Sequence, residues 1–385
     1  MTKRLFIVTG EPSGDIHASY VIKELKKLIN EIEISGVGGL EMKELGVNLL
    51  YDHSDMAVVG LDSFKKIPHH IKMGSNIINY LNNDFKPDLV LLIDYGGFNL
   101  RLAKELKKFN HKVFYYISPQ VWASRKGRLK KIKAYTDKMM LILPFEEPIH
   151  RGAGVNAEFV GHPLVSQLPE RCPKETFCKE NNLDPGKPLV GLFPGSRKME
   201  ISFLLETFIN TALIMQQKCP EIQFCLAQSI NISDNYINNI LQNINPNNKL
   251  NLTILKNSNY KVLSASDFVI LASGTVTLEA TIYNTPMIIS YKSYKIAYYL
   301  YLMLRYINKL GLPNIISGKD IVPEFLQKGA VPELMADTSL KLLHKSSERT
   351  TMINDLTNVR NLLTNNIASA RVAEIIYNEI KIKRY

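Results

Sequence analysis

Cysteine is scarce in this chain and tryptophan is almost absent. The 385 residues include four cysteines, at positions 172, 178, 219 and 225, and a single tryptophan, Trp122. No two cysteines have the CxxC spacing of a zinc site, and we expect no bound metal. The chain begins with Met1-Thr2-Lys3-Arg4 and a short apolar stretch that is too brief for the core of a secretion signal. We therefore expect free thiols in a reducing compartment.

Other absences each exclude a class of protein. No run of about 18 apolar residues is present, so no transmembrane helix is expected. The GxGxxG motif and the Walker A lysine loop are both missing, which disfavours a dinucleotide enzyme and an ATPase. With 45% hydrophobic and 22% charged residues, the composition is that of a globular protein, not of a disordered or fibrous one.

Positive charge is what the chain has in excess. It carries 47 Lys and Arg against 36 Asp and Glu, a formal net charge of +11. This balance favours anionic partners, such as phosphorylated substrates or an anionic membrane surface. Nucleic acid is not expected, because no DNA-binding pattern and no basic motif interleaved with aromatic residues is present.

Short apolar runs alternate with amphipathic stretches along the chain. The runs lie at 5–8, 89–93, 113–117 and 139–143, and again at 189–193, 223–226, 252–255, 268–271 and 287–290. Continuous apolar strands alternating with helices predict parallel sheets covered on both faces. The fold class is therefore α/β, with two Rossmann-like doubly wound domains that face a cleft. We place the domains at 1–165 and 166–345, and expect C-terminal helices at 346–385 that return to the first domain or pack on a partner.

Two loops of the first half carry candidate functional residues. Gly10-Glu11-Pro12-Ser13-Gly14-Asp15 follows the first strand and precedes a helix, a position where glycines and free amides suit an anion or a sugar. A tight turn with an Asp near the helix start explains this loop equally well. Asp94 ends the strand at 89–93, where a carboxylate can accept a proton from a hydroxyl nucleophile or can cap the next helix.

Two loops of the second half suit a nucleotide diphosphate. Pro194-Gly195-Ser196-Arg197 offers a guanidinium, backbone amides and a hydroxyl after one strand. Ser273-Gly274-Thr275 follows another strand and opens a helix, where free amides and hydroxyls suit phosphate oxygens. Glu279, one helical turn further on, is placed to hold a ribose diol or to sit on the helix surface.

Further segments each keep two interpretations. Trp122 either forms a wall of the site or packs in the core, and the run 125–133, with six basic residues of nine, either contacts phosphate or lipid or is a solvated helix face. The aromatic and basic segment 293–310 suits either a membrane-interface helix or a buried one. Residues 56–61 with Phe64 either line an acyl-binding surface or pack. His162 is expected to be a hinge or hydrogen-bonded structural residue, with ligand contact as the second interpretation.

Seven motifs in a fixed order carry a family resemblance. They are GEPSGD at 10–15, ID with FN at 93–99, ISPQVWA at 117–123, GHP at 161–163, PGSR at 194–197, SGTVTLE at 273–279 and LPNI with VPEFLQ at 312–327. Together they resemble the lipid-A-disaccharide synthases, which are inverting glycosyltransferases of GT-B architecture in Gram-negative outer-membrane biosynthesis. The resemblance spans nearly the whole chain.

The resemblance implies substrates, location and site residues. The donor would be UDP-2,3-diacylglucosamine and the acceptor 2,3-diacylglucosamine 1-phosphate (lipid X), giving the β-1,6 disaccharide 1-phosphate and UDP. The enzyme would act on the cytoplasmic face of the inner membrane as a peripheral protein, without a cofactor or metal, and a homodimer with exchanged C-terminal segments is one implied assembly. Asp94 would be the base, and the implied substrate-binding residues are Glu11, Ser13, Gly14, Ser196, Arg197, Ser273, Gly274, Thr275, Glu279, Asn314 and Gln327.

Two departures from the family pattern and two rival functions remain. Gly97 stands where the family often has a second Asp, which concentrates the base assignment on Asp94 or shifts part of it to Glu11 or Asp15. Ser124 stands where a second Trp is frequent. The rivals are another GT-B enzyme on UDP-GlcNAc, either a 2-epimerase or a peptidoglycan glycosyltransferase, and a non-catalytic nucleotide-sugar-binding protein.

Overall fold

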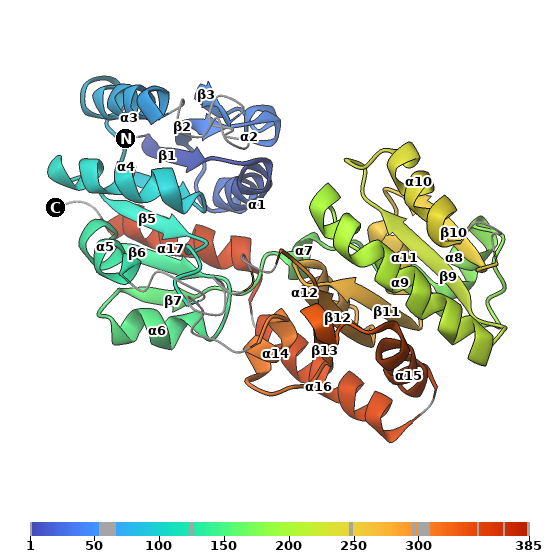
Figure 1. Cartoon of the computed structure of the whole chain (residues 1–385). Coiled ribbons are helices and arrows are strands. Elements are labelled where there is room, and N and C mark those ends of the chain that lie inside the picture. Colours follow the sequence, from blue (N-terminus) through green and yellow to red (C-terminus); the bar gives the residue numbers. More distant parts are fainter. Residues whose placement is uncertain are drawn as a thin grey trace. The chain divides into compact units, whose positions relative to one another are not determined.

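The chain forms two compact units, each built around one parallel sheet. The computed structural model describes residues 2–53, 67–122, 127–245, 249–294, 298, 309–344, 346–364 and 366–382. Unit 1 comprises Met1–Ser166 together with Leu363–Tyr385, and unit 2 comprises Gln167–Leu362 (Figure 1). Two predicted lipid-facing segments, 56–61 with Phe64 and most of 293–310, lie outside the described residues, as do residues 125–126 of the basic run.

Unit 1 contains a seven-stranded parallel sheet in the order β3-β2-β1-β4-β5-β6-β7. Its strands are β1 (Lys3–Thr9), β2 (Ile32–Gly38), β3 (Asn48–Asp52), β4 (Leu89–Ile93), β5 (Val113–Tyr116), β6 (Lys138–Leu141) and β7 (Ala157–Phe159). Its helices are α1 (Pro12–Leu28), α2 (Leu40–Glu44), α3 (Ile67–Tyr80), which continues into a π-helical turn at Leu81–Phe85, α4 (Gly96–Lys108), α5 (Arg128–Tyr135), α6 (Glu146–Gly152), α7 (Leu164–Gln167), which reaches the unit boundary, and α17 (Ala368–Ile382).

The continuous apolar strands of unit 1 are explained by burial of both sheet faces. Phe6 and Val8 of β1 belong to one hydrophobic cluster, which includes residues of α3, α4 and α5. Leu5 and Ile7, which point to the other face, belong to a second cluster with α1 and α17. Each fully buried Leu, Ile or Phe side chain contributes about 1.5–3 kcal/mol to folding, so the two clusters are the main source of stability.

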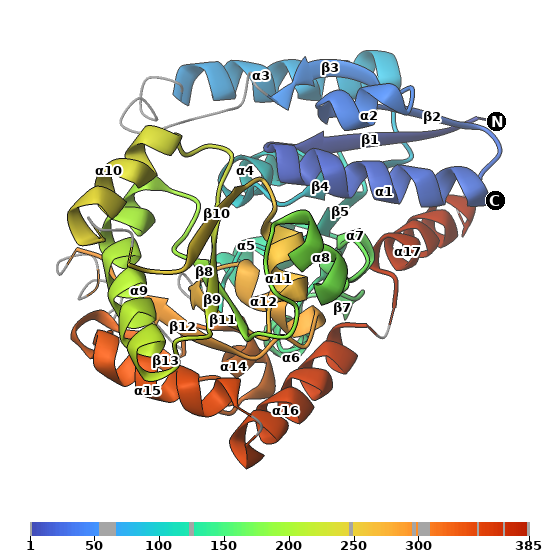
Figure 2. The ribbon, with the colours of Figure 1, turned by 90° about the vertical axis from the view of Figure 1, so that its right-hand side faces the viewer.

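The last helix of the chain packs on unit 1. Helix α17 lies against α1, as Figures 1 and 2 show, and the buried side chains of Val372 and Ile376 are part of the α1 cluster. Gly161 allows the C-terminal segment to pass close to the backbone of unit 1. It has φ +97°, and a Cβ on it would lie 2.5 Å from the carbonyl oxygen of Asn366. The GHP motif therefore supplies the close approach that the C-terminal segment requires.

Unit 2 contains a six-stranded parallel sheet in the order β10-β9-β8-β11-β12-β13. Its strands are β8 (Leu189–Phe193), β9 (Gln223–Gln228), β10 (Leu252–Lys256), β11 (Phe268–Ala272), β12 (Met287–Tyr291) and β13 (Glu324–Leu326). Its helices are α8 (Lys174–Glu180), α9 (Lys198–Lys218), α10 (Asp234–Ile244), α11 (Asn259–Ala265), α12 (Val276–Ile282), α14 (Leu312–Ser317), α15 (Pro332–Leu343) and α16 (Ser347–Leu363). Helices α9 and α15 pack together over β11, while α11 contacts β8, β9 and β10.

The predicted fold class is confirmed, because both halves are doubly wound parallel sheets. The segment predicted as one C-terminal block, 346–385, is divided in the structure. Helix α16 lies in unit 2 up to Leu362, and α17 lies in unit 1. The physical reason is that the apolar side chains of α17 are buried in one cluster with those of α1. The apolar side chains Met352 and Leu356 of α16 are instead buried within unit 2.

Candidate functional site

Asp94 lies in a strained turn between β4 and α4. Asp94 and the following Tyr95 both have left-handed backbone conformations, with φ of +48° and +47°. Such residues cost about 1–2 kcal/mol each unless the surroundings hold them. Here the carbonyl oxygen of Asp94 accepts hydrogen bonds from the Tyr115 hydroxyl at 2.5 Å and from the Asn99 side-chain amide at 2.9 Å. The turn is therefore fixed from two neighbouring elements.

The side chain of Asp94 is half-buried and has the electrostatics of a base. Burial raises its pKa above the ordinary value, and the nearby Glu11 carboxylate raises the pKa further. A hydrogen bond from the backbone amide of Tyr95 opposes these effects. A carboxylate with a raised pKa holds a proton more tightly, which is the property that a general base requires.

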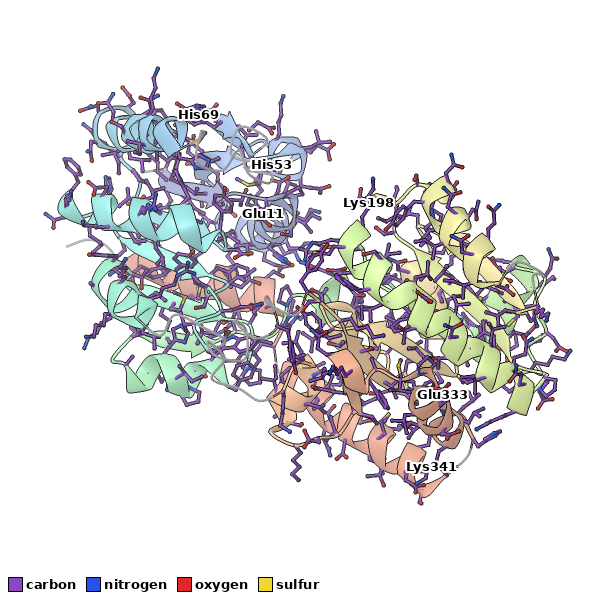
Figure 3. All side chains as sticks on the ribbon, viewed as in Figure 1. Glu11, His53, His69, Lys198, Glu333 and Lys341 are labelled. Atoms are coloured by element: carbon purple, nitrogen blue, oxygen red, sulfur yellow. The ribbon has the colours of Figure 1, made fainter. Side chains whose placement is uncertain are left out.

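The loop after β1 contributes Glu11 beside this turn. The Tyr95 ring packs directly on Gly10, and a Cβ on Gly10 would lie 2.2 Å from the ring. Glu11 and Ser13 are exposed, and Figure 3 labels Glu11 at the start of α1. Gly14 is buried instead, with Thr9 as its neighbour, so it allows close packing of helix and strand.

Asp15, considered as a helper of the base, has a different task. It is 2% exposed, and its Oδ1 accepts hydrogen bonds from the amides of Gly39 and Met42. Its Oδ2 accepts from the amide of Glu41. Asp15 therefore caps helix α2, and both of its carboxylate oxygens are occupied in that role.

Trp122 is buried within unit 1, with 6% of its surface exposed. Its Nε1 donates to Oε1 of Glu146 at 3.0 Å, and its ring packs edge-on against Phe145. Glu146 is 2% exposed, and burial raises its pKa to about 8. Next to this pair, Nδ1 of the buried His150 donates to the Glu146 carbonyl, so its Nε2 accepts from the Ser118 hydroxyl at 2.9 Å. Sequence reasoning missed Glu146 and His150.

His162 is structural, as expected. Its Nδ1 accepts a hydrogen bond from the amide of Leu164, and burial lowers its pKa to about 3. His162 is therefore neutral, and its backbone amide donates to Leu363 of the returning segment.

Unit 2 has a pocket of about 310 Å³ at the carboxyl ends of β8, β9 and β11. Six of the predicted substrate-binding residues line it: Ser196, Arg197, Ser273, Gly274, Thr275 and Glu279. Ser229 and Asn259 also line the pocket, and neither carried a sequence motif. The structure thus brings the two predicted phosphate loops together in one place, where open α/β sheets bind ligands.

Glu200 organises the PGSR loop. Its Oε2 accepts hydrogen bonds from the amides of Ser196 and Arg197, at 2.9 and 3.3 Å. Gly195, with φ +123°, leaves room for this carboxylate, since a Cβ there would lie 2.5 Å from Oε2. The Arg197 side chain is 79% exposed and only 3.3 Å from Oε1 of Glu200, so the guanidinium keeps most of its donors available.

Glu279 has an unusual protonation behaviour within this pocket. Burial raises its pKa to about 7. At neutral pH both forms are populated, so the group both donates and accepts hydrogen bonds.

The Ser273 hydroxyl donates to the carbonyl of Leu310, while Gly274 and Thr275 are exposed.

Asn314 and Gln327 do not line this pocket. Asn314 is 1% exposed, and its amide donates to the carbonyl of Val322 and to Glu324. Its carbonyl accepts from the amides of Ile321 and Val322, so its hydrogen-bonding capacity is used within unit 2. Gln327, with φ +52°, bonds through its side-chain amide to Ser293. The side chains of both residues therefore form hydrogen bonds with segments next to β13.

Two searches of the described residues are negative. Within the ranges that the structure describes, no group of three or more His, Cys, Asp or Glu is arranged to hold a metal ion. In the same ranges, none of the helices is both long enough and apolar enough to cross a bilayer.

Solved structures define the class of the fold. A UDP-GlcNAc 2-epimerase from Neisseria meningitidis bound to UDP-GlcNAc matches with a TM-score of 0.64 at 13% identity, covering 97% of this chain and 100% of that chain. The MurG of Acinetobacter baumannii matches with a TM-score of 0.58 at 12% identity, covering 98% and 100%. Two parallel Rossmann-like sheets with this likeness define a GT-B-like protein.

Sequence relatives define the family within that class. A family model described as lipid-A-disaccharide synthetase matches residues 5–377. A lipid-A-disaccharide synthase of Coxiella burnetii (strain CbuG_Q212) is 36% identical over 378 residues, covering 98% of this chain and 99% of the relative. Another, from Trichlorobacter lovleyi, is 38% identical over 379 residues and covers 98% of each chain. The chain belongs to the lipid-A-disaccharide synthetase family and is a glycosyltransferase of lipid A biosynthesis.

Proposed function

We propose that this chain transfers the diacylglucosaminyl group of UDP-2,3-diacylglucosamine to the 6-hydroxyl of 2,3-diacylglucosamine 1-phosphate, with Asp94 as the base. The observation that carries the assignment is the half-buried Asp94 carboxylate, held in a fixed turn with a raised pKa. The family to which the chain belongs supports the reaction type.

The proposed chemistry is a single displacement with inversion. The acceptor oxygen forms a bond to the anomeric carbon while the bond from that carbon to the UDP oxygen breaks. The hydroxyl proton moves to Asp94, and the negative charge moves to the β-phosphate of UDP. A positioned base of this kind contributes about 10²–10⁴-fold to the rate.

The unit 2 pocket is the proposed donor site. The exposed Arg197 guanidinium and the Ser273–Thr275 loop are suited to the charge that develops on UDP. Losing one such electrostatic contact typically costs about 3–4 kcal/mol of barrier. Glu279, with its pKa near 7, suits the two hydroxyls of a ribose because it both donates and accepts. The reaction requires Asp94 and this pocket to act on the same pair of substrates.

Asn314 is proposed as a positioning residue for this site. It holds Glu324, whose carboxylate also accepts from the amides of Leu310 and Gly311. The carbonyl of the same Leu310 receives the Ser273 hydroxyl of the donor pocket. Asn314 is thus linked to the pocket through two hydrogen-bonded neighbours, without needing to touch the donor.

The substrates call for a peripheral position on an anionic membrane, at the cytoplasmic face of the inner membrane. Each buried CH₂ is worth about 0.8 kcal/mol, so drawing whole acyl chains from a bilayer into water is prohibitive. The net charge of +11 suits anionic headgroups. A homodimer that exchanges C-terminal segments would use the same face of α1 that α17 covers within this chain.

Product analysis tests the function. Purified protein is incubated with UDP-diacylglucosamine and lipid X in neutral detergent, and the products are identified by mass. We expect a disaccharide 1-phosphate and UDP from the wild type, and at least a hundredfold less from Asp94→Asn with donor binding retained. Free N-acetylmannosamine from UDP-GlcNAc would instead indicate a 2-epimerase. Tight UDP binding without any product would indicate a non-catalytic binding protein.

A further inference from the structure

A cationic groove lies next to the Asp94 turn, between helices α4 and α5 of unit 1. It has a volume of about 360 Å³. Its lining residues are Gly96, Gly97, Leu100, Arg101, Lys104, Arg128, Lys131 and Tyr135. On α4 these positions follow the 3–4-residue spacing of one helix face, and on α5 residues 128, 131 and 135 do the same. Four of the eight lining residues are therefore cations on two facing helix surfaces.

Among the residues that the structure describes, no carboxylate lines the groove. The lining set contains no Asp or Glu, and none of the ion pairs among the described residues involves Arg101, Lys104 or Lys131. The contrast within α4 is clear. Lys107 pairs with Asp137 and Lys108 pairs with Glu105, and neither lysine lines the groove. The cations that line the groove therefore form a concave positive patch, and such a patch attracts an anion.

The groove adjoins the proposed base directly. Gly96 and Gly97 line the groove at the first turn of α4, and they follow Asp94 and Tyr95 in the chain. A Cβ on Gly97 would meet nothing within 4 Å, so this end of the groove is open. Arg128 connects the two regions, because its Nη1 lies 3.6 Å from where a Cβ on Gly96 would be, and its charge acts on Tyr115. Tyr115 in turn holds the carbonyl of Asp94.

We propose that this groove binds a phosphate monoester, namely the anomeric phosphate of the acceptor. The inference rests on the proposed function, because it is that acceptor which carries both a reacting hydroxyl and a phosphate on one sugar ring. A site for the phosphate should then lie close to the base, and the groove adjoins the Asp94 turn through Gly96 and Gly97. Guanidinium and ammonium groups in a concave site are the usual partners of phosphate.

Two adjacent lysines of α5 provide a matched test. Both side chains are exposed, but only Lys131 lines the groove. Lys131→Glu and Lys130→Glu therefore make the same change in charge, inside and outside the groove. Initial rates are measured in neutral detergent micelles with lipid X and with the same diacylglucosamine lacking the phosphate. We expect Lys131→Glu to raise the KM for lipid X at least about tenfold, with kcat and the donor KM unchanged. The KM for the phosphate-free acceptor should stay the same, and Lys130→Glu should behave as the wild type.

Several results would overturn the inference. Equal behaviour of the two glutamate variants, or an equal change in KM for both acceptors, would show that the groove does not hold the phosphate. An effect of Lys131→Glu that appears only on vesicles of anionic phospholipid, and disappears in neutral micelles, would identify a bilayer headgroup as the ligand. Arg101→Glu, on the other helix, should reproduce the Lys131→Glu result, which guards against a local folding defect.

A binding measurement separates this inference from the proposed reaction. Calorimetric titration with glucosamine 1-phosphate, which is water-soluble, should show binding to the wild type and to Lys130→Glu, and at least about tenfold weaker binding to Lys131→Glu. If the wild type forms no disaccharide at all, the proposed function fails. If it forms the disaccharide and all variants bind glucosamine 1-phosphate equally, only the inference about the groove fails.

Discussion

At the scale of single residues, the hydrogen bond between Glu146 and Trp122 offers an optical readout of a buried carboxyl group. Burial raises the pKa of Glu146 to about 8, and Trp122 is the only tryptophan in the chain. We expect the intrinsic fluorescence to change with a midpoint near pH 8, because ionisation places a negative charge 3.0 Å from the indole nitrogen. Glu146→Gln should abolish that transition. A titration that persists in this variant would contradict the assignment.

The ionisation of Glu146 should also make the free energy of unfolding fall as the pH rises. The folded-state pKa of Glu146 is raised above 4.5, its ordinary value, so the folded protein binds the proton more tightly than the unfolded chain. The contribution of the protonated Glu146 side chain to the free energy of unfolding is therefore fully present below about pH 4.5. It is lost as the pH rises through about 8. Unfolding by denaturant at pH 6.5 and pH 9 measures this loss, and Glu146→Gln should show less of it.

Asp94 should set the acidic limb of the rate profile. Below its raised pKa the carboxyl group already holds a proton and accepts no other, so kcat/KM should rise with pH and then level off. The midpoint should lie above 3.8, the ordinary value for Asp. Because Glu11 contributes to the shift, Glu11→Gln should move the midpoint to lower pH. A midpoint that stays fixed, or moves upward, would remove Glu11 from the environment of the base.

Replacing Asp94 should also affect stability in a defined direction. Its raised pKa means that the ionised form is disfavoured in the folded state, so Asp94→Asn should be more stable than the wild type at neutral pH. The difference should shrink as the pH falls toward the ordinary pKa of Asp. Equilibrium unfolding at pH 7.5 and pH 5 makes the comparison. A variant less stable than the wild type at both values would indicate that Asp94 supports the turn itself.

How far the sequence predicts single residues depends on where their partners lie. Asp94 and Arg197 were predicted as site residues because each lies in a loop that follows a strand, and strand ends meet along one edge of a parallel sheet. Glu279 was predicted because it lies one helical turn beyond such a loop. Glu200 was missed because its role depends on the positive φ of Gly195, five residues earlier. Asp15 carried a functional signature but caps α2, a contact 24 residues away that no local pattern reveals.

At the scale of elements, Asn314 secures the turn that leads from α14 to β13. Its side chain makes four hydrogen bonds to the Ile321–Glu324 segment. We expect Asn314→Ala to lower the free energy of unfolding by about 2–4 kcal/mol, because buried amides and a carboxylate lose their partners. Denaturant unfolding measures the change. A variant with unchanged stability and a higher donor KM would show instead that Asn314 touches the substrate.

Element types were easier to predict than their limits. The strand at 89–93 is found unchanged as β4, because it is apolar on both faces and bounded by polar residues. β2 was not singled out, since Ser35, Gly36 and Gly38 interrupt its apolar run. In the sheet, Ser35 and Gly36 pair with Phe6 and Ile7 of β1. β13, with three residues, was recognised only as part of a motif because it is too short for any periodicity.

At the scale of the whole molecule, the chain passes from unit 1 to unit 2 and back again. It leaves unit 1 after Ser166 and returns at Leu363, so unit 1 is built from segments almost 200 residues apart in the sequence. Ion pairs secure the return, since Arg371 bonds to Glu158 and Lys112 to Glu379. Unit 1 therefore cannot complete its core until the C-terminus has been synthesised, whereas unit 2 is continuous.

This arrangement predicts a local effect of mutations in α17. Ile376 is fully buried against the α1 cluster, so Ile376→Ala should destabilise unit 1 by about 2–5 kcal/mol. Hydrogen exchange followed by mass spectrometry should show lost protection in α1 and β1, with β8 and β9 of unit 2 unchanged. Asn378→Ala, at an exposed position of the same helix, is the matched control and should alter neither unit. Loss of protection in β8 and β9 as large as that in α1 would mean that α17 stabilises the two units together.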